Sequence, residues 1–270
     1  MEPLTPVPSG SVGNTILVEL LDAIQNRRAV ALATIVATDR SVPRRPGSKM
    51  LVFADGRTSG TIGGGEMEAR VVAEALEALV SGKSRQLIYS LVDAAAGDPG
   101  VCGGTVELFL EPHMPQPTVY VIGVGHVGQA VVELALWLGY RVAAWDDRSD
   151  LAASVNTATT DVGILSGSIH EALETNPIDE HTMVVMTTRN VGLDVEILPP
   201  LLASQAPFIG IMGSQRRWEI TREKLAAAGE TETNLNRVQS PIGIDINAET
   251  PVEIAVSILA EVIGHQRHES

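Results

Sequence analysis

Two hydrophobic patterns alternate in the second half of the chain. Residues 118–122 and 141–145 are short, mostly apolar runs, which predict buried strands. Between them, apolar residues recur at every third or fourth position from Val127 to Leu138, and this spacing predicts a helix packed on one face. Gly139 follows directly, as a glycine often does just past the end of a helix.

The same alternation continues to the end of the chain, which is typical of a parallel sheet covered by helices. Strands are expected at residues 182–187 and 208–212, with a short extended run at 241–246. Helices are expected at residues 194–202, 215–228 and 251–263, with a frayed tail after them. Pro199 and Pro200 are expected to interrupt or end the first of these helices. Ser214 is expected to cap the second, and a capping box at Thr250 the third.

The first half of the chain has a different order of elements. Strands are expected at residues 29–38, 50–54, 84–91 and 106–110, and helices at 16–24 and 67–79. The segment MPQP contains two prolines and is expected to link two domains. The expected organisation is a flexible segment at 1–13, an N-terminal α/β domain at 14–113, a linker at 114–117 and a Rossmann-like, doubly wound parallel-sheet domain at 118–270.

The turn before the helix that follows residue 122 carries Gly123, Gly125 and Gly128 in a G-x-G-x-x-G pattern, and the next strand ends on Asp146 and Asp147. In this arrangement one glycine makes the tight turn, one lets backbone approach a pyrophosphate, and one lets the helix pack on the strand. The helix N terminus offers N–H donors to phosphates, and a carboxylate after the second strand accepts hydrogen bonds from ribose hydroxyls. The pattern therefore predicts a Rossmann fold with a nucleotide-type ligand.

Occupancy by a dinucleotide is a separate question from the fold. The same glycines serve packing alone in a doubly wound domain without a ligand, so both interpretations stay open. His126 lies inside the glycine turn. Its side chain either fills a position in the turn or touches a ligand at the start of the helix.

Three consecutive glycines, Gly63, Gly64 and Gly65, open another predicted helix. Such a run has a large conformational-entropy cost and is typical of unusual backbone angles or of close approach to another group. The turn can present N–H groups to an anion. Glu66 and Glu68 favour a different use, because carboxylates in a first turn suit the helix dipole or accept N–H bonds from a heterocycle.

Positive charge is concentrated in the loop after the first long strand, at Arg40, Arg44, Arg45 and Lys49. This loop is either a solvated surface or an anion site. Cys102, the only cysteine, lies beside glycines and is either a buried small side chain or an accessible thiol. A free thiol has a pKa of about 8.5 and needs a positive neighbour, such as one of these arginines, to become a thiolate.

Composition narrows the classes of protein. The chain has 270 residues, 44% of them apolar, so it can form cores in two modest domains or one large one. A net charge of −14 argues against binding of nucleic acid and of anionic membranes. No apolar run approaches the roughly 20 residues of a membrane span, and the N terminus lacks the pattern of a signal peptide. With one cysteine, the chain is expected to be cytoplasmic.

Other site chemistry is sparse. The six histidines are scattered, so no protein-built metal site is expected. Neither a G-x-S-x-G pattern nor a cysteine–histidine pair is visible.

Taken together, several segments resemble the xanthine dehydrogenase accessory factor family (XdhC/CoxI). The resemblance runs from about Val30 to Ile263 and keeps the order of the family. The segments are SVPRRPGSKMLVFADG, GTIGGGEMEARV, VCGGTVELFLEP, VIGVGHVGQAVVELALWLGYRVAAWDDR, FIGIMGSQRR and PIGIDINAETPVEIAVSILAEV.

The resemblance implies a maturation factor, often dimeric, for molybdenum hydroxylases such as xanthine or CO dehydrogenase. Such factors hold the molybdenum cofactor, help it to receive its terminal sulfur, with a cysteine desulfurase as a further partner, and pass it to the apo-enzyme. The resemblance places Cys102 at the cysteine of the family, as a sulfur acceptor or a molybdenum ligand through the bound cofactor. It also implies that Gly63, Gly64 and Gly65 contact the molybdopterin.

One departure from the family pattern concerns the loop after residue 187. Family members commonly carry a histidine where this chain has Val191, which marks it as a divergent member. The expected function is therefore cofactor binding and transfer. The alternatives are an NAD(P)-dependent oxidoreductase using the Rossmann site and a non-catalytic scaffold that binds the client enzyme through its acidic surface.

Overall fold

The computed structural model describes residues 12–40, 42–90, 104–154 and 164–268. Backbone contacts divide the chain into two compact units. The first unit ends at Pro115, and the second begins at Gln116. Each unit has its own sheet and its own core, so each is described by itself.

The N-terminal unit is built on a five-stranded antiparallel sheet with the strand order β3-β2-β1-β5-β4. Its strands are β1 (Val30–Asp39), β2 (Lys49–Phe53), β3 (Thr58–Gly60), β4 (Arg85–Ser90) and β5 (Thr105–His113). Its helices are α1 (Val12–Gln25) and α2 (Gly65–Ser81). All six elements expected in this half of the chain are present, and β3 is an additional short strand.

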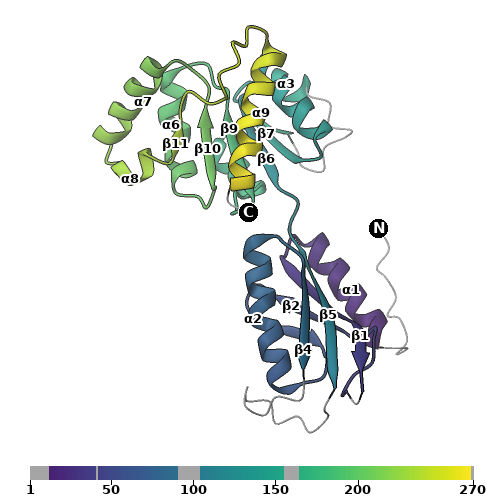
Figure 1. Cartoon of the computed structure of the whole chain (residues 1–270). Helices are drawn as coiled ribbons and strands as arrows, with labels where there is room; N and C mark the ends of the chain where they lie inside the picture. The colour runs from purple at the N-terminus through teal and green to yellow at the C-terminus, as the bar shows by residue number, and fades with distance from the viewer. Residues whose placement is uncertain (1–11, 41, 91–103, 155–163, 269–270) are drawn as a thin grey trace. The chain divides into compact units, whose positions relative to one another are not determined.

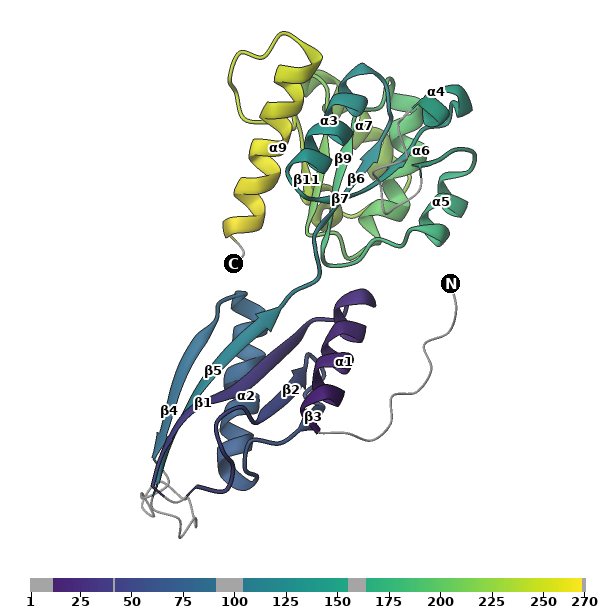
Figure 2. The same cartoon turned by 90° about the vertical axis from the view of Figure 1, so that its right-hand side faces the viewer.

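The two helices cover opposite faces of this sheet (Figures 1 and 2). Successive residues of a strand point to opposite faces, and β1 is buried on both. Val30 and Leu32 pack with α1, whereas Ala31, Ala33 and Ile35 pack with α2. This double burial explains why β1 reads as a continuous apolar run rather than as an alternating one.

The C-terminal unit is built on a six-stranded parallel sheet. Its strands are β6 (Thr118–Ile122), β7 (Arg141–Trp145), β8 (Ile164–Leu165), β9 (Thr182–Met186), β10 (Phe208–Ile211) and β11 (Val238–Gln239). Its helices are α3 (His126–Trp137), α4 (Ser149–Ser154), α5 (Ile169–Thr175), α6 (Val191–Leu202), α7 (Gln215–Ala227), α8 (Glu232–Leu235) and α9 (Pro251–His268).

The strand order, β11-β10-β9-β6-β7-β8, is that of a Rossmann fold. The chain leaves β6 toward β7 and β8, and then returns to place β9 on the other side of β6. One core lies between the sheet and α3 and α9, and another between the sheet and α5, α6 and α7 (Figure 1). The predicted fold class is thus confirmed, and the reversal of strand order places the topological switch point of the sheet at the ends of β6 and β9.

The two prolines of α6 do not interrupt it, although the helix ends close after them, at the expected residue. The helix runs through Pro199 and Pro200 and ends at Leu202. Helix propensity is a weak constraint where packing is strong. Both prolines lie in the last turn, and the flanking side chains, Ile197, Leu198 and Leu201, are fully buried in the core.

Two boundaries near the C terminus also differ from the expected ones. The last strand is β11, and residues 241–246 are not extended in the sheet, because Ile242 turns back to pack over Gly210. The final helix does not end near Ile263 but continues through His268. A ring contact between His265 and Phe208, with centroids 5.1 Å apart, ties its last turns to β10.

The capping box of α9 is present as predicted, and it gives a direct test of what fixes this helix. The Thr250 hydroxyl accepts the Glu253 N–H at 3.3 Å, and the Glu253 carboxylate accepts the Thr250 N–H at 2.9 Å. Replacing Thr250 with Ala is expected to lower the free energy of unfolding by about 1 kcal/mol, measured by urea titration. Glu249→Ala, at an exposed neighbouring position, serves as the control and should leave stability unchanged; an equal loss in both variants would contradict the capping role.

Candidate functional site

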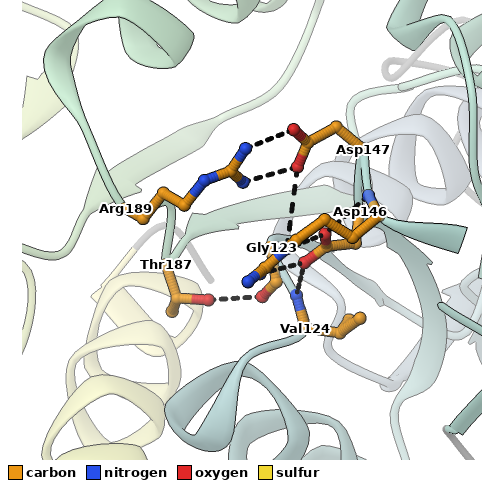
Figure 3. Close-up of polar contacts among 7 residues, drawn as sticks. Gly123, Val124, Asp146, Asp147, Thr187 and Arg189 are labelled. Atoms are coloured by element: carbon orange, nitrogen blue, oxygen red, sulfur yellow. Dashed lines mark hydrogen bonds and ion pairs between the residues drawn. The ribbon is translucent and has the colours of Figure 1, made fainter. Parts of the chain in front are cut away.

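The region between the loop after β6 and the loop after β9, at the topological switch point of the sheet, is called the crevice below. The Thr187 N–H donates to the Ile122 carbonyl at 2.8 Å, and the Thr187 hydroxyl donates to the Gly123 carbonyl at 2.5 Å (Figure 3). These bonds fix the two loops against each other at the carboxyl ends of the strands. In open α/β sheets, this is the position at which ligands bind.

The three glycines of the motif differ in their surroundings, and two of them take structural roles that the spacing predicts. Gly123 has a φ of +95° and makes the turn. A Cβ on Gly128 would lie 2.0 Å from the Gly123 carbonyl oxygen, so this glycine permits close packing of α3. A Cβ on Gly125 would meet no described atom within 4 Å. Gly125 therefore leaves open space at the N terminus of α3, where no side chain caps the helix.

Asp146 is buried beneath the glycine turn, with 1% of its surface exposed. One carboxylate oxygen, Oδ2, accepts the Val124 N–H at 2.8 Å and the Arg148 Nη2 at 2.9 Å. The other, Oδ1, accepts the Arg148 N–H at 2.9 Å and the Arg148 Nε at 2.8 Å. Figure 3 shows this carboxylate turned inward, toward Val124. Four donors thus occupy the roughly four lone-pair directions of one carboxylate.

The environment of Asp146 keeps it ionised. Burial acts to raise the pKa of this carboxyl, but the hydrogen bonds from Arg148 and Val124 and the charge of Arg148 outweigh it, so the pKa lies below its ordinary value. The expected hydrogen bonds from ribose hydroxyls to Asp146 have no free acceptor in this arrangement. Its place in the site is structural, because it ties the glycine turn to the end of β7.

Asp147, the next residue, points across the crevice. Its carboxylate accepts both Nη groups of Arg189 at 2.6 and 2.5 Å, in a parallel fork that Figure 3 shows. The pair remains accessible, with 31% of the Asp147 side chain and 45% of the Arg189 side chain exposed. His126, the first residue of α3, is exposed at the same end of the sheet.

A second fork, which the sequence did not reveal, orders the loop after β9. Asp194 is buried and accepts Nε and Nη2 of Arg217, both at 2.8 Å, and also the Thr188 hydroxyl. Asn190 caps α6 by accepting the Leu193 N–H. The only sequence signal for this cluster was Arg217, in the segment FIGIMGSQRR that resembles the family.

The triple-glycine turn of the N-terminal unit closes around a carboxylate of its own chain. Gly63, Gly64 and Gly65 all have positive φ angles, of +146°, +87° and +68°. The Glu68 Oε1 accepts the N–H groups of Ile62, Gly63 and Gly64 at 3.0, 3.2 and 2.9 Å, and the hydroxyl of Thr61 at 2.5 Å. The turn is therefore an anion nest that Glu68 occupies.

These bonds keep Glu68 charged and change the expected role of the turn. Burial acts to raise the pKa of Glu68, but the hydrogen bonds from the Thr61 hydroxyl and from the backbone N–H groups together outweigh burial. The pKa of Glu68 therefore lies below its ordinary value. In this arrangement Glu68 already accepts the N–H groups of Gly63 and Gly64, which were expected to face a ligand. All four bonds end on Oε1.

The arginine loop lies against this turn. A Cβ on Gly63 would lie 2.8 Å from Cγ of Pro43, the residue before Arg44. Arg44 and Arg45 are exposed. The fold thus brings the predicted cationic segment to the triple-glycine turn.

Two further predicted site residues belong to this unit. Glu66 forms an ion pair with Arg70, one helical turn further along α2. Cys102 lies outside the described residues, so its predicted place beside the turn is not tested.

Metal-binding clusters and membrane spans are both absent from the described ranges. Within them, no group of three or more histidine, cysteine, aspartate or glutamate side chains is arranged to hold a metal ion. Likewise, no helix in these ranges combines the length and apolar character of a membrane span.

Comparison with family models matches both units. The model described as the XdhC Rossmann domain matches residues 119–262, and the model described as the XdhC and CoxI family matches residues 23–90. The two matches follow the order of the two units along the chain.

Three relatives share sequence with more than half of the chain. An uncharacterized protein of Escherichia coli, YqeB, is 34% identical over 86% of this chain and 43% of its own length. The molybdenum cofactor insertion chaperone PaoD of E. coli is 26% identical over 94% of this chain and 89% of its own length. A protein of Bacillus subtilis described as a probable xanthine dehydrogenase component is 27% identical over 59% of this chain and 46% of its own length. The alignments thus span less than half of the length of YqeB and of the B. subtilis protein.

Asp146 provides a test of the electrostatic support of the glycine turn. Asp146→Asn is expected to lower the free energy of unfolding by about 2–4 kcal/mol at pH 7, because Arg148 and the Val124 N–H lose a buried charged acceptor. Because the folded pKa is lowered, this stabilisation is complete above the unfolded pKa of about 3.8 and is lost as the pH falls through the folded value.

Urea titrations at pH 7 and near pH 3 measure both effects. Asp147→Asn is the matched control, since its exposed ion pair contributes at most about 1 kcal/mol. Equal losses in the two variants, or a loss for Asp146→Asn that is the same at both pH values, would refute the structural role of this carboxylate.

Proposed function

Because the chain belongs to the XdhC and CoxI family, we propose that it is a maturation factor that binds the molybdenum cofactor and assists its sulfuration and its insertion into a molybdenum hydroxylase. The observation that carries this proposal is that both units match models of one family. In addition, PaoD, which is named as a molybdenum cofactor insertion chaperone, aligns with this chain over most of its own length. The cofactor is the cargo of the protein rather than a group it uses for its own turnover.

In the proposal, the N-terminal unit holds the pterin part of the cargo. Molybdopterin carries a phosphate, which Arg44 and Arg45 bind from the exposed loop. Its pyrimidine ring carries N–H donors, which the second carboxylate oxygen of Glu68, Oε2, accepts. Cys102 acts as the soft sulfur group near the metal, either as a ligand or as a sulfur acceptor.

The amides of Gly63 and Gly64 have a different part in this proposal. They shape the turn around Glu68 rather than touch the cargo. Glu66, through its ion pair with Arg70, keeps the first turn of α2 in place beside them.

The Rossmann unit holds a nucleotide moiety in the proposal, either NAD(P) or the nucleotide end of a dinucleotide form of the cofactor. Gly125 leaves room for a pyrophosphate at the N terminus of α3, and His126 lies beside it. Gly123 and Gly128 act by shaping the turn.

Partners and location follow from the same role. The client is a molybdenum hydroxylase of the xanthine or CO dehydrogenase type, and a cysteine desulfurase supplies the sulfur. The protein acts in the cytoplasm, as a homodimer. A net charge of −14 makes nucleic acid an unfavourable partner.

The Rossmann crevice itself favours a second candidate, an NAD(P)-dependent oxidoreductase. The strand order and the open Gly125 suit a nicotinamide dinucleotide. However, Val191 stands where the family pattern has a histidine, so that imidazole is not available as an acid or base. Consumption of NAD(P)H with a small carbonyl or hydroxyl substrate would favour this candidate over the first.

The pterin content of the purified protein tests the first proposal. The protein is produced in a host that makes molybdopterin, and bound pterin is measured by fluorescence after oxidation. The wild type is expected to retain pterin, and Arg44→Ala with Arg45→Ala is expected to retain at least tenfold less. Arg28→Ala with Arg57→Ala removes the same charge from the same unit and serves as the control.

Cys102→Ser adds a second readout. It is expected to fold as the wild type does, but to transfer less sulfur or cofactor to an apo-hydroxylase. Absence of pterin from both the wild type and Cys102→Ser would refute the proposed function, and loss of folding in Cys102→Ser would show that the thiol is structural.

A further inference from the structure

The Asp147–Arg189 pair joins the two sides of the Rossmann crevice. Asp147 follows β7, whereas Arg189 belongs to the loop after β9, and β6 lies between these strands. The two side chains face each other above the turn that carries Gly123 and Val124 (Figure 3). The pair thus lies where the ribose of a nucleotide lies in a Rossmann fold, at the end of the second strand of the unit.

Hydrogen-bond capacity decides which of the two aspartates can receive a ribose. Asp146 accepts four bonds and is 1% exposed, so it has no lone pair to offer. Asp147 accepts two bonds from Arg189 and keeps about two lone-pair directions, with 31% of its side chain exposed.

Charge decides which ribose fits. The crevice holds two carboxylates and two guanidinium groups. Arg148 forks onto Asp146 and Arg189 forks onto Asp147, and the Arg148 Nε also lies 3.9 Å from the Asp147 Oδ1. A free guanidinium at this place favours a 2′-phosphate, as in sites for phosphorylated dinucleotides. Here neither guanidinium is free, since each forks onto a carboxylate.

We propose that Asp147 is the acceptor for the 2′- and 3′-hydroxyls of the bound nucleotide, and that Arg189 is a specificity-determining residue because its pairing with Asp147 excludes a 2′-phosphate. This inference rests on the nucleotide site of the proposed function and names the class of ligand that the site takes. A diol donates to the remaining lone pairs of Asp147 without breaking the fork. A 2′-phosphate can bind Arg189 only by displacing it from Asp147. The phosphate and the unpaired Asp147 carboxylate would then lie side by side as two anions.

The pair is suited to discriminate because it is fixed by geometry rather than by burial. Two parallel hydrogen bonds from Arg189 orient the Asp147 carboxylate. An isolated exposed aspartate has no such fixed orientation. Removing Asp147 leaves Arg189 with no fork partner in the crevice, next to Asp146, which Arg148 already neutralises. The site then gains a free positive charge and should prefer the phosphorylated ligand.

Calorimetric titration of the full chain with NADH and NADPH tests this inference, with ADP and CDP as shorter probes. The wild type is expected to bind NADH at least tenfold more tightly than NADPH. Asp147→Ala is expected to reverse the preference, with NADPH at least fivefold tighter. Adding Arg189→Ala to that variant should remove the preference altogether. Asp150→Ala, which removes an exposed acid from the following helix, should keep the wild-type ratio.

Each other outcome contradicts a distinct claim. Equal affinities in the wild type, tighter binding of NADPH, or an unchanged preference in Asp147→Ala would refute the selectivity and leave the nucleotide site standing. Binding of ADP or CDP without binding of NADH would also refute the proposed selectivity. If the wild type binds none of the four probes, the nucleotide half of the proposed function is refuted, and the selectivity with it.

Discussion

In both units, a glycine turn is held by a carboxylate that the chain itself supplies. A turn that lacks side chains exposes backbone N–H groups, and buried N–H groups require an acceptor. Glu68 accepts from Ile62, Gly63 and Gly64 in one unit, and Asp146 accepts from Val124 in the other. Both carboxyl groups have lowered pKa values, because hydrogen bonds from Arg148 and the Val124 N–H to Asp146, and from the Thr61 hydroxyl and the turn N–H groups to Glu68, outweigh burial.

This constraint determines which groups remain for a ligand. In the Rossmann unit, the groups that remain accessible to a ligand are those next to the glycine turn, at Gly125, His126 and Asp147. In the N-terminal unit, they are the exposed arginines beside Pro43. A preformed turn also lowers the cost of binding, because the backbone does not have to be ordered by the ligand. A carrier that holds and releases its cargo is well served by such rigid turns with accessible charges around them.

Most of the fold followed from periodicity and from glycine spacing, whereas the hydrogen-bond partners did not. Gly123 makes the tight turn and Gly128 permits close packing of α3, as their spacing predicts. However, a sequence cannot show that the carboxylate of Asp146 turns back to Val124. Adjacent acids look alike in sequence, and Asp146 differs from Asp147 only in the burial and the hydrogen-bond partners that the fold gives it.

The errors in element boundaries have a related cause. A local signal, two adjacent prolines, favoured an interruption of α6, but the helix continues through them to Leu202, where Leu201 and its neighbours pack on the sheet. The Arg217–Asp194 fork joins residues on different helices, so no short motif marked it. Contacts of this kind, between residues far apart in the chain, determine how side chains are placed but leave no short motif in the sequence.

Amide-resolved nuclear magnetic resonance tests most directly whether the chain's own carboxylates hold the glycine turns while a ligand binds. The backbone amides are followed during a titration with ADP. The signals of Gly125 and His126 are predicted to shift, while the Val124 amide stays protected from exchange by its bond to Asp146. Loss of that protection on binding, with Val124 taken over by the ligand, would contradict the central claim.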